Sequence, residues 1–162
     1  MKKLALISVI LFAACNQPQK EKTIEIPVTH YYKTDKDPVR HAIIKYDAYR
    51  DSNILGAKGN ATNLTKADLL TIEALIKKET SKYNQSAKGK LITAPEKYYK
   101  QLISIIDHEN EKIVWVDCAC QVFGDDWKKY LLNANDGGTC NFHLKINLTK
   151  GIVIGFWVNG LA

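Results

Sequence analysis

Arginine is nearly absent from this sequence of 162 residues, in which only Arg40 and Arg50 supplement the lysines. Lysine is a point charge and lacks the planar fork with which arginine clamps phosphate or carboxylate groups. The lysines are scattered along the chain and acidic residues stand among them, so no basic stripe marks a nucleic-acid site. We therefore expect a solvated surface of mixed charge and no nucleic-acid partner.

Sequence signatures of common enzyme classes are also missing. The chain has no Gly-rich phosphate loop, no Gly-x-Ser-x-Gly elbow and no His-Glu-x-x-His helix. No pattern places a histidine within hydrogen-bond reach of a cysteine nucleophile, and none sets two carboxylates across a cleft. We expect no catalytic residues, no cofactor and no metal ion.

A hydrophobic run long enough to span a membrane is missing as well. The apolar run Leu4–Ala14 covers about 17 Å at ~1.5 Å per residue, whereas a membrane core is ~30 Å thick. The run follows Lys2 and Lys3 and leads through small residues to Cys15, which is the order of parts in a secretory signal peptide. We interpret residues 1–14 as an export signal.

The end of this signal, Phe12-Ala13-Ala14-Cys15, resembles the lipobox of bacterial lipoproteins, with Phe12 where that family usually has leucine. The resemblance implies cleavage before Cys15, fatty acyl chains such as palmitate on Cys15, and a stable membrane anchor when two or more chains are attached. Asn16 stands where an aspartate usually signals retention in the inner membrane. By resemblance we expect the outer membrane, on its periplasmic side. The alternative, an ordinary cleaved signal, has a poor cleavage site here.

The mature chain divides into a tether and one domain. Residues 15–38 are polar and interrupted by proline, which predicts a flexible tether behind the lipid anchor. Residues 39–162 are enough for a single core, and we expect one α+β domain there. Removal of residues 1–14 takes two lysines with it, so the formal net charge falls from +6 to +4.

The clearest helix signal runs from Thr65 to about Tyr83. Thr65 can cap the first turn, with Asp68 at the capping-box position. Apolar residues recur at helical spacing after it, which predicts a helix with one face packed on a sheet. Residues 41–50 fit a strand or a short helix, and residues 51–64 are expected to form a loop.

Most of the second half of the chain has the pattern of strands separated by hairpin turns. The expected strands are Tyr98–Ile106, Ile113–Cys120, Tyr130–Asn135, Cys140–Leu148 and Ile152–Val158. Together they predict an antiparallel meander of four to five strands covered by one helix, which resembles a cystatin-like arrangement. A three-residue loop, 149–151, would pair Leu148 with Ile152 and keep the apolar faces together.

The sheet face away from the helix is the predicted ligand face. It brings together two tryptophans, one histidine and charged side chains, and Lys100 is expected opposite Asp117. The predicted residues are Trp115, Trp157, His143, Lys145, Lys100 and Asp117. Exposed aromatic rings among polar groups suit a carbohydrate, peptide or protein partner. The alternative is that residues 30–60 cover this face and make it a second core.

Three cysteines remain once Cys15 is assigned to lipid: Cys118, Cys120 and Cys140. In a plain meander Cys140 lies roughly 15–20 Å from Cys118, beyond the ~7 Å that a disulfide tolerates. This favours buried thiols. A bent sheet or another strand order leaves open a disulfide between Cys120 and Cys140. A metal site with His143 is disfavoured, because Cys140 and His143 point to opposite faces of a strand.

The order of features also resembles small lipoproteins of the Bacteroidota, a group that implies no particular activity. The residues that carry this resemblance are Tyr83-Asn84, Trp115, 118–120, 136–140 and 158–162. The sequence thus predicts a non-catalytic, lipid-anchored envelope protein that binds a partner. Alternatives are an inhibitor of a hydrolase that acts through loop 121–129 and, less favoured, a small hydrolase.

Overall fold

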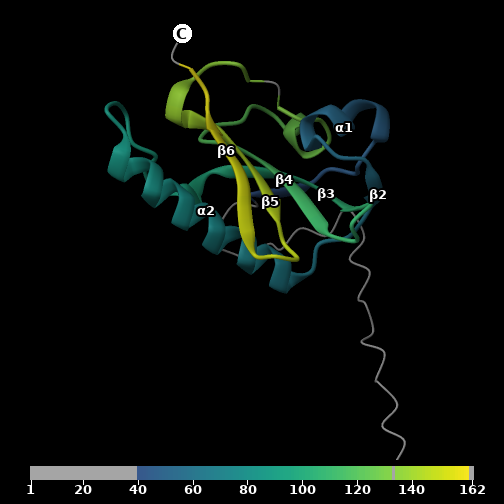
Figure 1. The fold of residues 1–162 in the computed structure, drawn as a ribbon. Coiled ribbons are helices and arrows are strands. Elements are labelled where there is room, and N and C mark those ends of the chain that lie inside the picture. The colour runs from purple at the N-terminus through teal and green to yellow at the C-terminus, as the bar shows by residue number, and fades with distance from the viewer. Residues whose placement is uncertain (1–39, 133, 161–162) are drawn as a thin grey trace, which may run out of the picture.

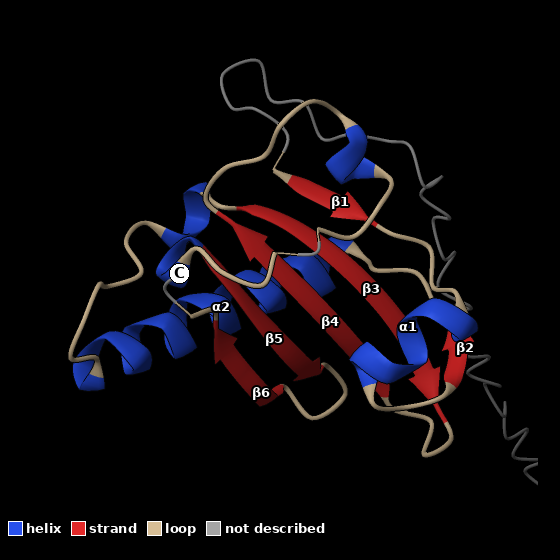
Figure 2. Ribbon diagram, turned by 90° about the horizontal axis from the view of Figure 1, so that it is seen from above, coloured by secondary structure: helices blue, strands red, loops and turns tan. Residues whose placement is uncertain are grey.

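A computed structural model describes residues 40–132 and 134–160 of the chain. These residues form the expected α+β fold, arranged in three layers around a six-stranded sheet (Figures 1 and 2). Helix α2 lies against one face of the sheet, and helix α1 together with the connection that follows β4 lies against the other. The predictions for Cys15 and for residues 1–38 lie outside the described residues.

Helix α2, Lys66–Ser86, is the helix predicted from Thr65 to Tyr83. The side chain of Thr65 accepts a hydrogen bond from the backbone N–H of Asp68, and the Asp68 side chain accepts one in return from Thr65. This capping box satisfies two N–H groups that have no partner within the helix. The buried stripe of the helix packs on the sheet, so the amphipathic pattern predicted its orientation correctly.

The sheet is mixed and is not the predicted meander. Four antiparallel strands form its centre and one edge: β3 (Tyr99–Asp107), β4 (Lys112–Ala119), β5 (Asn141–Asn147) and β6 (Ile152–Val158). On the outer side of β3, β1 (His41–Ile43) pairs parallel and β2 (Gly59–Ala61) pairs antiparallel. A second helix, α1 (Ala48–Leu55), begins in residues 41–50, where a strand or a short helix was expected, and continues into residues 51–64, which were expected to form a loop. Strands of three residues are too short to show a period.

The strand predicted at 130–135 does not form among the described residues of that range. Instead, one side chain makes hydrogen bonds to three backbone groups between residues 127 and 132. The amide of Gln101 donates to the carbonyl oxygens of Trp127 and Tyr130 and accepts from the N–H of Leu132. The short helix η2 (Asp126–Lys128) buries Trp127 beneath this clamp.

Without a strand between them, β4 and β5 are direct neighbours, and Ala119 pairs with Asn141. This register places Cys120 beside Cys140, and the two form a disulfide. The preference for buried thiols was wrong for this pair, because it assumed a strand between β4 and β5; the disulfide left open for another strand order is present. Cys118 is a buried free thiol.

The pairing of β3 with β4 differs by one residue from the prediction. Gln101, rather than Lys100, pairs with Asp117. The connection at 108–110 is one residue longer than a two-residue turn, with Asn110 in the left-handed region at φ 60°. A shift of one residue moves every side chain of a strand to the other face. Lys100 therefore points to the α2 side and not to the predicted ligand face.

The turn between β5 and β6 also differs from the prediction by one residue, but a later irregularity restores the predicted register. Asn147, rather than Leu148, pairs with the neighbour of the turn, Ile152. A β-bulge between Lys145 and Ile146 then shifts the register back. Beyond the bulge His143 pairs with Trp157, which is the register implied by the predicted pairing of Leu148 with Ile152.

Each face of the sheet has its own core. The core under α2 includes Leu102, Val116 and Phe142, whereas the core on the opposite face includes Ile103, Ile105 and other side chains. Strand β3 is therefore apolar on both sides. Its sequence had no alternation that could reveal which face lay under the helix.

Candidate functional site: the aromatic face of the sheet

Three rings gather on the sheet face opposite α2. Trp115 on β4 is stacked with His143 on β5, with centroids 5.5 Å apart and planes at 20°. Trp115 is also stacked with Trp157 on β6, at 5.6 Å and 30°. Trp157 is 49% exposed, while Trp115 and His143 are partly buried. The three aromatic residues of the predicted face are therefore brought together, with one ring open to solvent.

The position of Trp157 depends on Gly155, two residues earlier on the same strand. A Cβ atom on Gly155 would lie 2.0 Å from the Trp157 ring, so the indole lies back over the strand where a side chain is missing. The missing Cβ thus lets the indole reach Trp115. A glycine inside an otherwise apolar strand was the sequence signal for this close approach.

The polar groups of the face form an internal chain. His143 Nδ1 lies 3.2 Å from Asp117 Oδ1, and His143 Nε2 lies 2.9 Å from Asn159 Oδ1. The Asn159 amide in turn donates to the carbonyl oxygens of Ala134 and Asp136. Asn159 was missed by the sequence reasoning, because it lies past the end of the last strand.

Burial of the imidazole lowers the pKa of His143, but the Asp117 carboxylate and the Asn159 oxygen oppose it. The net result is a pKa above the ordinary value for histidine. The protonated ring is therefore favoured between Asp117 and Asn159. The hydrogen-bonding groups of Asp117, His143 and Asn159 are therefore engaged with one another and with the backbone of the protein.

Lys145 is also engaged within the fold. A Cβ atom on Gly56, the C-terminal cap of α1, would lie 3.3 Å from Lys145 Nζ. The last turn of α1 contains no basic residue of its own. A cation is favoured near the carbonyl groups at a helix C-terminus, so Lys145 complements this end of α1.

Lys100 does not belong to this face. It is fully buried under α2, where Nζ lies 3.2 Å from Glu73 Oε1 and 3.1 Å from the carbonyl oxygen of Tyr98. His41 Nε2 contacts the same Glu73 oxygen at 2.6 Å. Burial raises the pKa of Glu73, but His41 and Lys100 lower it further, and the net pKa is below the ordinary value. The sequence reasoning missed this cluster because it placed Lys100 on the wrong face.

Strand β6 forms an edge of the sheet in the described structure, since its position is last in the strand order. Three apolar side chains along it are about half exposed. They are Ile152 at 46%, Ile154 at 47% and Trp157 at 49%, and we call them the apolar rim. The β-bulge leaves Ile154 without a direct partner on β5.

A second exposed aromatic side chain lies in the connection after β4. Phe123 is 82% exposed and is followed by Gly124 in the left-handed region at φ 61°. This short stretch is held on one side by the Cys120–Cys140 disulfide and on the other by buried Trp127. The loop thus displays an aromatic ring between two fixed points.

Among residues 40–132 and 134–160, no three side chains of the metal-binding types are grouped to hold an ion. Within the same residues, no helix is both long enough and apolar enough to cross a membrane. Searches against protein-family models, curated proteins and solved structures find no match to this chain.

Proposed function

We propose that this protein is a non-catalytic, lipid-anchored envelope protein that binds another protein through the apolar rim of β6. The observation that carries the proposal is the half-exposed state of Ile152, Ile154 and Trp157 on an edge strand. Among the described strands β6 is an edge, and apolar side chains beside the backbone groups of a sheet edge suit a partner that adds a strand. In such a complex the backbone supplies affinity and the rim supplies specificity.

A protein partner fits this face better than a carbohydrate. Sugar recognition needs polar groups that are directed outward around an aromatic ring. Here the His143–Asp117–Asn159 chain is directed inward and Lys145 lies against α1. What the face offers to solvent is mainly the Trp157 ring and the two isoleucines, which match the apolar centre of a protein interface.

Capture of the partner from envelope membranes tests the binding proposal. The native lipidated protein should retain a specific protein, whereas Trp157→Ala and Ile154→Lys should each reduce its recovery at least about tenfold, as expected for loss of an interface anchor. Tyr49→Ala is the matched control, because Tyr49 is 97% exposed on α1, away from the rim. Equal recovery by all three variants would rule out the rim.

The lipid anchor is tested separately at Cys15. Mass spectrometry of the mature N-terminus should find acyl chains on Cys15, in the outer-membrane fraction. Cys15→Ser should release the cleaved protein into the soluble fraction, because no acyl chain then remains to be buried in the bilayer. Membrane retention of the cleaved variant would contradict the anchor.

The second candidate function is inhibition of a hydrolase through the loop that displays Phe123. A loop fixed at both ends binds with little loss of conformational freedom, which favours inhibitors. The same capture experiment distinguishes the two surfaces. If the rim binds the partner, Phe123→Ala should leave partner recovery unchanged. If Phe123→Ala abolishes partner recovery and Trp157→Ala does not, the partner binds the loop.

A further inference from the structure

The net charge of the described residues is concentrated in one segment. Residues 77–97, which we call the basic segment, contain six lysines and two glutamates and so carry a net charge of +4. The other described residues carry eleven basic and eleven acidic side chains, which cancel. The lysines of the basic segment are Lys77, Lys78, Lys82, Lys88, Lys90 and Lys97, and all are exposed.

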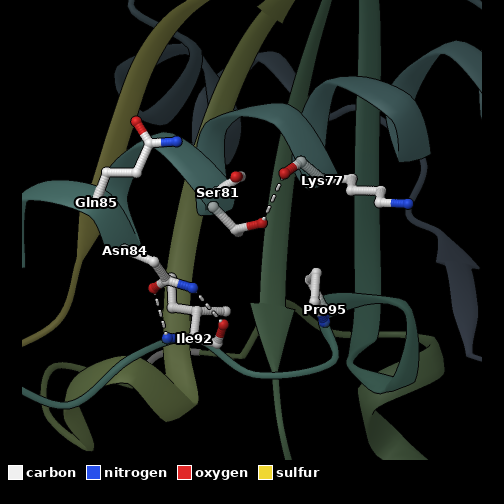
Figure 3. A pocket seen from close by; sticks show the side chains of 7 residues that line it. Lys77, Ser81, Asn84, Gln85, Ile92 and Pro95 are labelled. Atoms are coloured by element: carbon white, nitrogen blue, oxygen red, sulfur yellow. Dashed lines mark hydrogen bonds between the residues drawn. The ribbon is translucent and has the colours of Figure 1, made fainter.

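The basic segment folds into one surface. The C-terminal half of α2 leads into a loop that returns along the helix to the short helix η1 (Pro95–Lys97), which contacts α2. Asn84 fixes this return, because its amide donates to the Ile92 carbonyl oxygen at 2.8 Å and accepts from the Ile92 N–H at 2.9 Å (Figure 3). The backbone of the whole basic segment, which carries these exposed lysines, is thus held together along one part of the molecule.

An open groove of about 350 Å³ runs between the helix and the returning chain. Its lining includes Lys77, Ser81, Asn84, Gln85, Ile92 and Pro95 (Figure 3). The lining combines the Lys77 side chain with the hydroxyl of Ser81 and the amide of Gln85. A cation together with hydrogen-bond donors suits the oxygens of a phosphate group.

The chain enters the described fold beside this surface. Arg40 donates a hydrogen bond to the carbonyl oxygen of Lys97, and its guanidinium lies 5.0 Å from the centre of the Tyr99 ring. The 24 residues between Cys15 and Arg40 can span at most about 85 Å. A membrane that holds Cys15 is therefore within reach of the basic segment.

We propose that the basic segment docks on the phosphate headgroups of an anionic membrane. The inference rests on the proposed lipid anchor for the nearness of the membrane, but not for the charge of the surface. Exposed lysines near an anionic bilayer add attraction that is screened by salt. With the basic segment on the membrane, the domain would have a fixed orientation rather than a free one.

Vesicle binding tests this proposal on the mature chain, residues 15–162, with Cys15→Ser, so that neither the export signal nor an acyl chain contributes. The vesicles contain phosphatidylcholine alone or an equal mixture with phosphatidylglycerol, and bound protein is measured by sedimentation. The test variant removes three charges of the basic segment, and the control removes three exposed charges elsewhere. The substitutions are Lys77→Gln, Lys82→Gln and Lys90→Gln in the test variant, and Lys45→Gln, Lys58→Gln and Lys129→Gln in the control.

At low salt the chain should bind the anionic vesicles more tightly than the neutral ones. The test variant should lose on the order of 100-fold of the anionic affinity, at about 5-fold per lysine, and the control should keep most of it. Equal losses in the two variants would overturn the proposal, as would equal binding to both vesicle types. Binding to soluble polyphosphate but not to vesicles would also overturn it and indicate a polymeric anion.

Circular dichroism of both variants verifies that the fold is retained. If mass spectrometry finds Cys15 unmodified while the preference for anionic vesicles persists, the proposed lipid anchor is wrong and the proposed docking surface is supported. If Cys15 is acylated and the preference for anionic vesicles is absent, the proposed docking surface is wrong and the lipid anchor is supported.

Discussion

Lys100 is a fully buried lysine in the core under α2. Its ammonium is fully buried and is balanced by Glu73 on α2, which also contacts His41 on β1. A buried ion pair adds little to stability over an apolar pair, but removal of one partner leaves a charge without compensation. Glu73 tolerates the loss of its partner better than Lys100 does. The Glu73 side chain is 30% exposed and can contact water, whereas the Lys100 side chain is fully buried.

We predict that Glu73→Leu lowers the free energy of unfolding by about 3–5 kcal/mol, because Lys100 is then left charged in the core with only carbonyl partners. Lys100→Met should cost less, about 1–2 kcal/mol, since Glu73 keeps His41 and contact with water. Urea unfolding measures both. The double variant should be more stable than Glu73→Leu alone; additive losses would contradict the account.

At the scale of the element, β6 shows how a missing side chain shapes a surface. The bulge of this strand sets the register in which Trp157 pairs with His143, and Gly155 leaves the space that the Trp157 ring occupies. The indole can stack with Trp115 only because Gly155 has no Cβ. The surface proposed to bind a partner is therefore set by a glycine that would not contact the partner.

We predict that Gly155→Ala rotates the Trp157 ring away from Trp115. The near-ultraviolet circular dichroism of the stacked indoles should fall. Stability should change by less than about 1.5 kcal/mol, because lost ring packing offsets the benefit of alanine in a strand. Gly160→Ala is the control, since a Cβ there would have nothing within 4 Å. An unchanged spectrum in the first variant would show that the ring is held by other contacts.

At the scale of the whole molecule, the Cys120–Cys140 disulfide joins the start and end of a long irregular connection. It closes the segment that carries both exposed Phe123 and buried Trp127. The Gln101 clamp holds the middle of the same segment to β3. One face of the sheet is thus covered by a stretch of chain that has no strand pairing of its own among the described residues.

We predict that replacing Cys120 and Cys140 together by serine lowers the free energy of unfolding by about 3 kcal/mol, as expected for a crosslink that closes a loop of 20 residues. In a separate variant that carries Cys15→Ser alone and keeps Cys120 and Cys140, the unfolded and unreduced protein should titrate one thiol, that of Cys118. Three thiols in this titration would show that the disulfide does not form.

Local sequence patterns correctly predicted the elements whose signal is contained within a few neighbouring residues. Thr65 and Asp68 located the start of α2, and the apolar residues at every second position from Phe142 to Ile146 are the side of β5 that packs under α2. The ring cluster of Trp115, His143 and Trp157 followed from the same alternation. In each case the signal lies in the spacing of polar and apolar residues along one element.

Local sequence patterns were sufficient to predict the α+β class, the capped amphipathic helix and the gathering of aromatic rings on one side of the sheet. The face of Lys100, the pairing of Cys120 with Cys140 and the parallel addition of β1 required the three-dimensional fold. These depend on one residue in a turn and on which strands become neighbours. Such choices are made by burial and hydrogen bonding between segments far apart in the chain, and no local period records them.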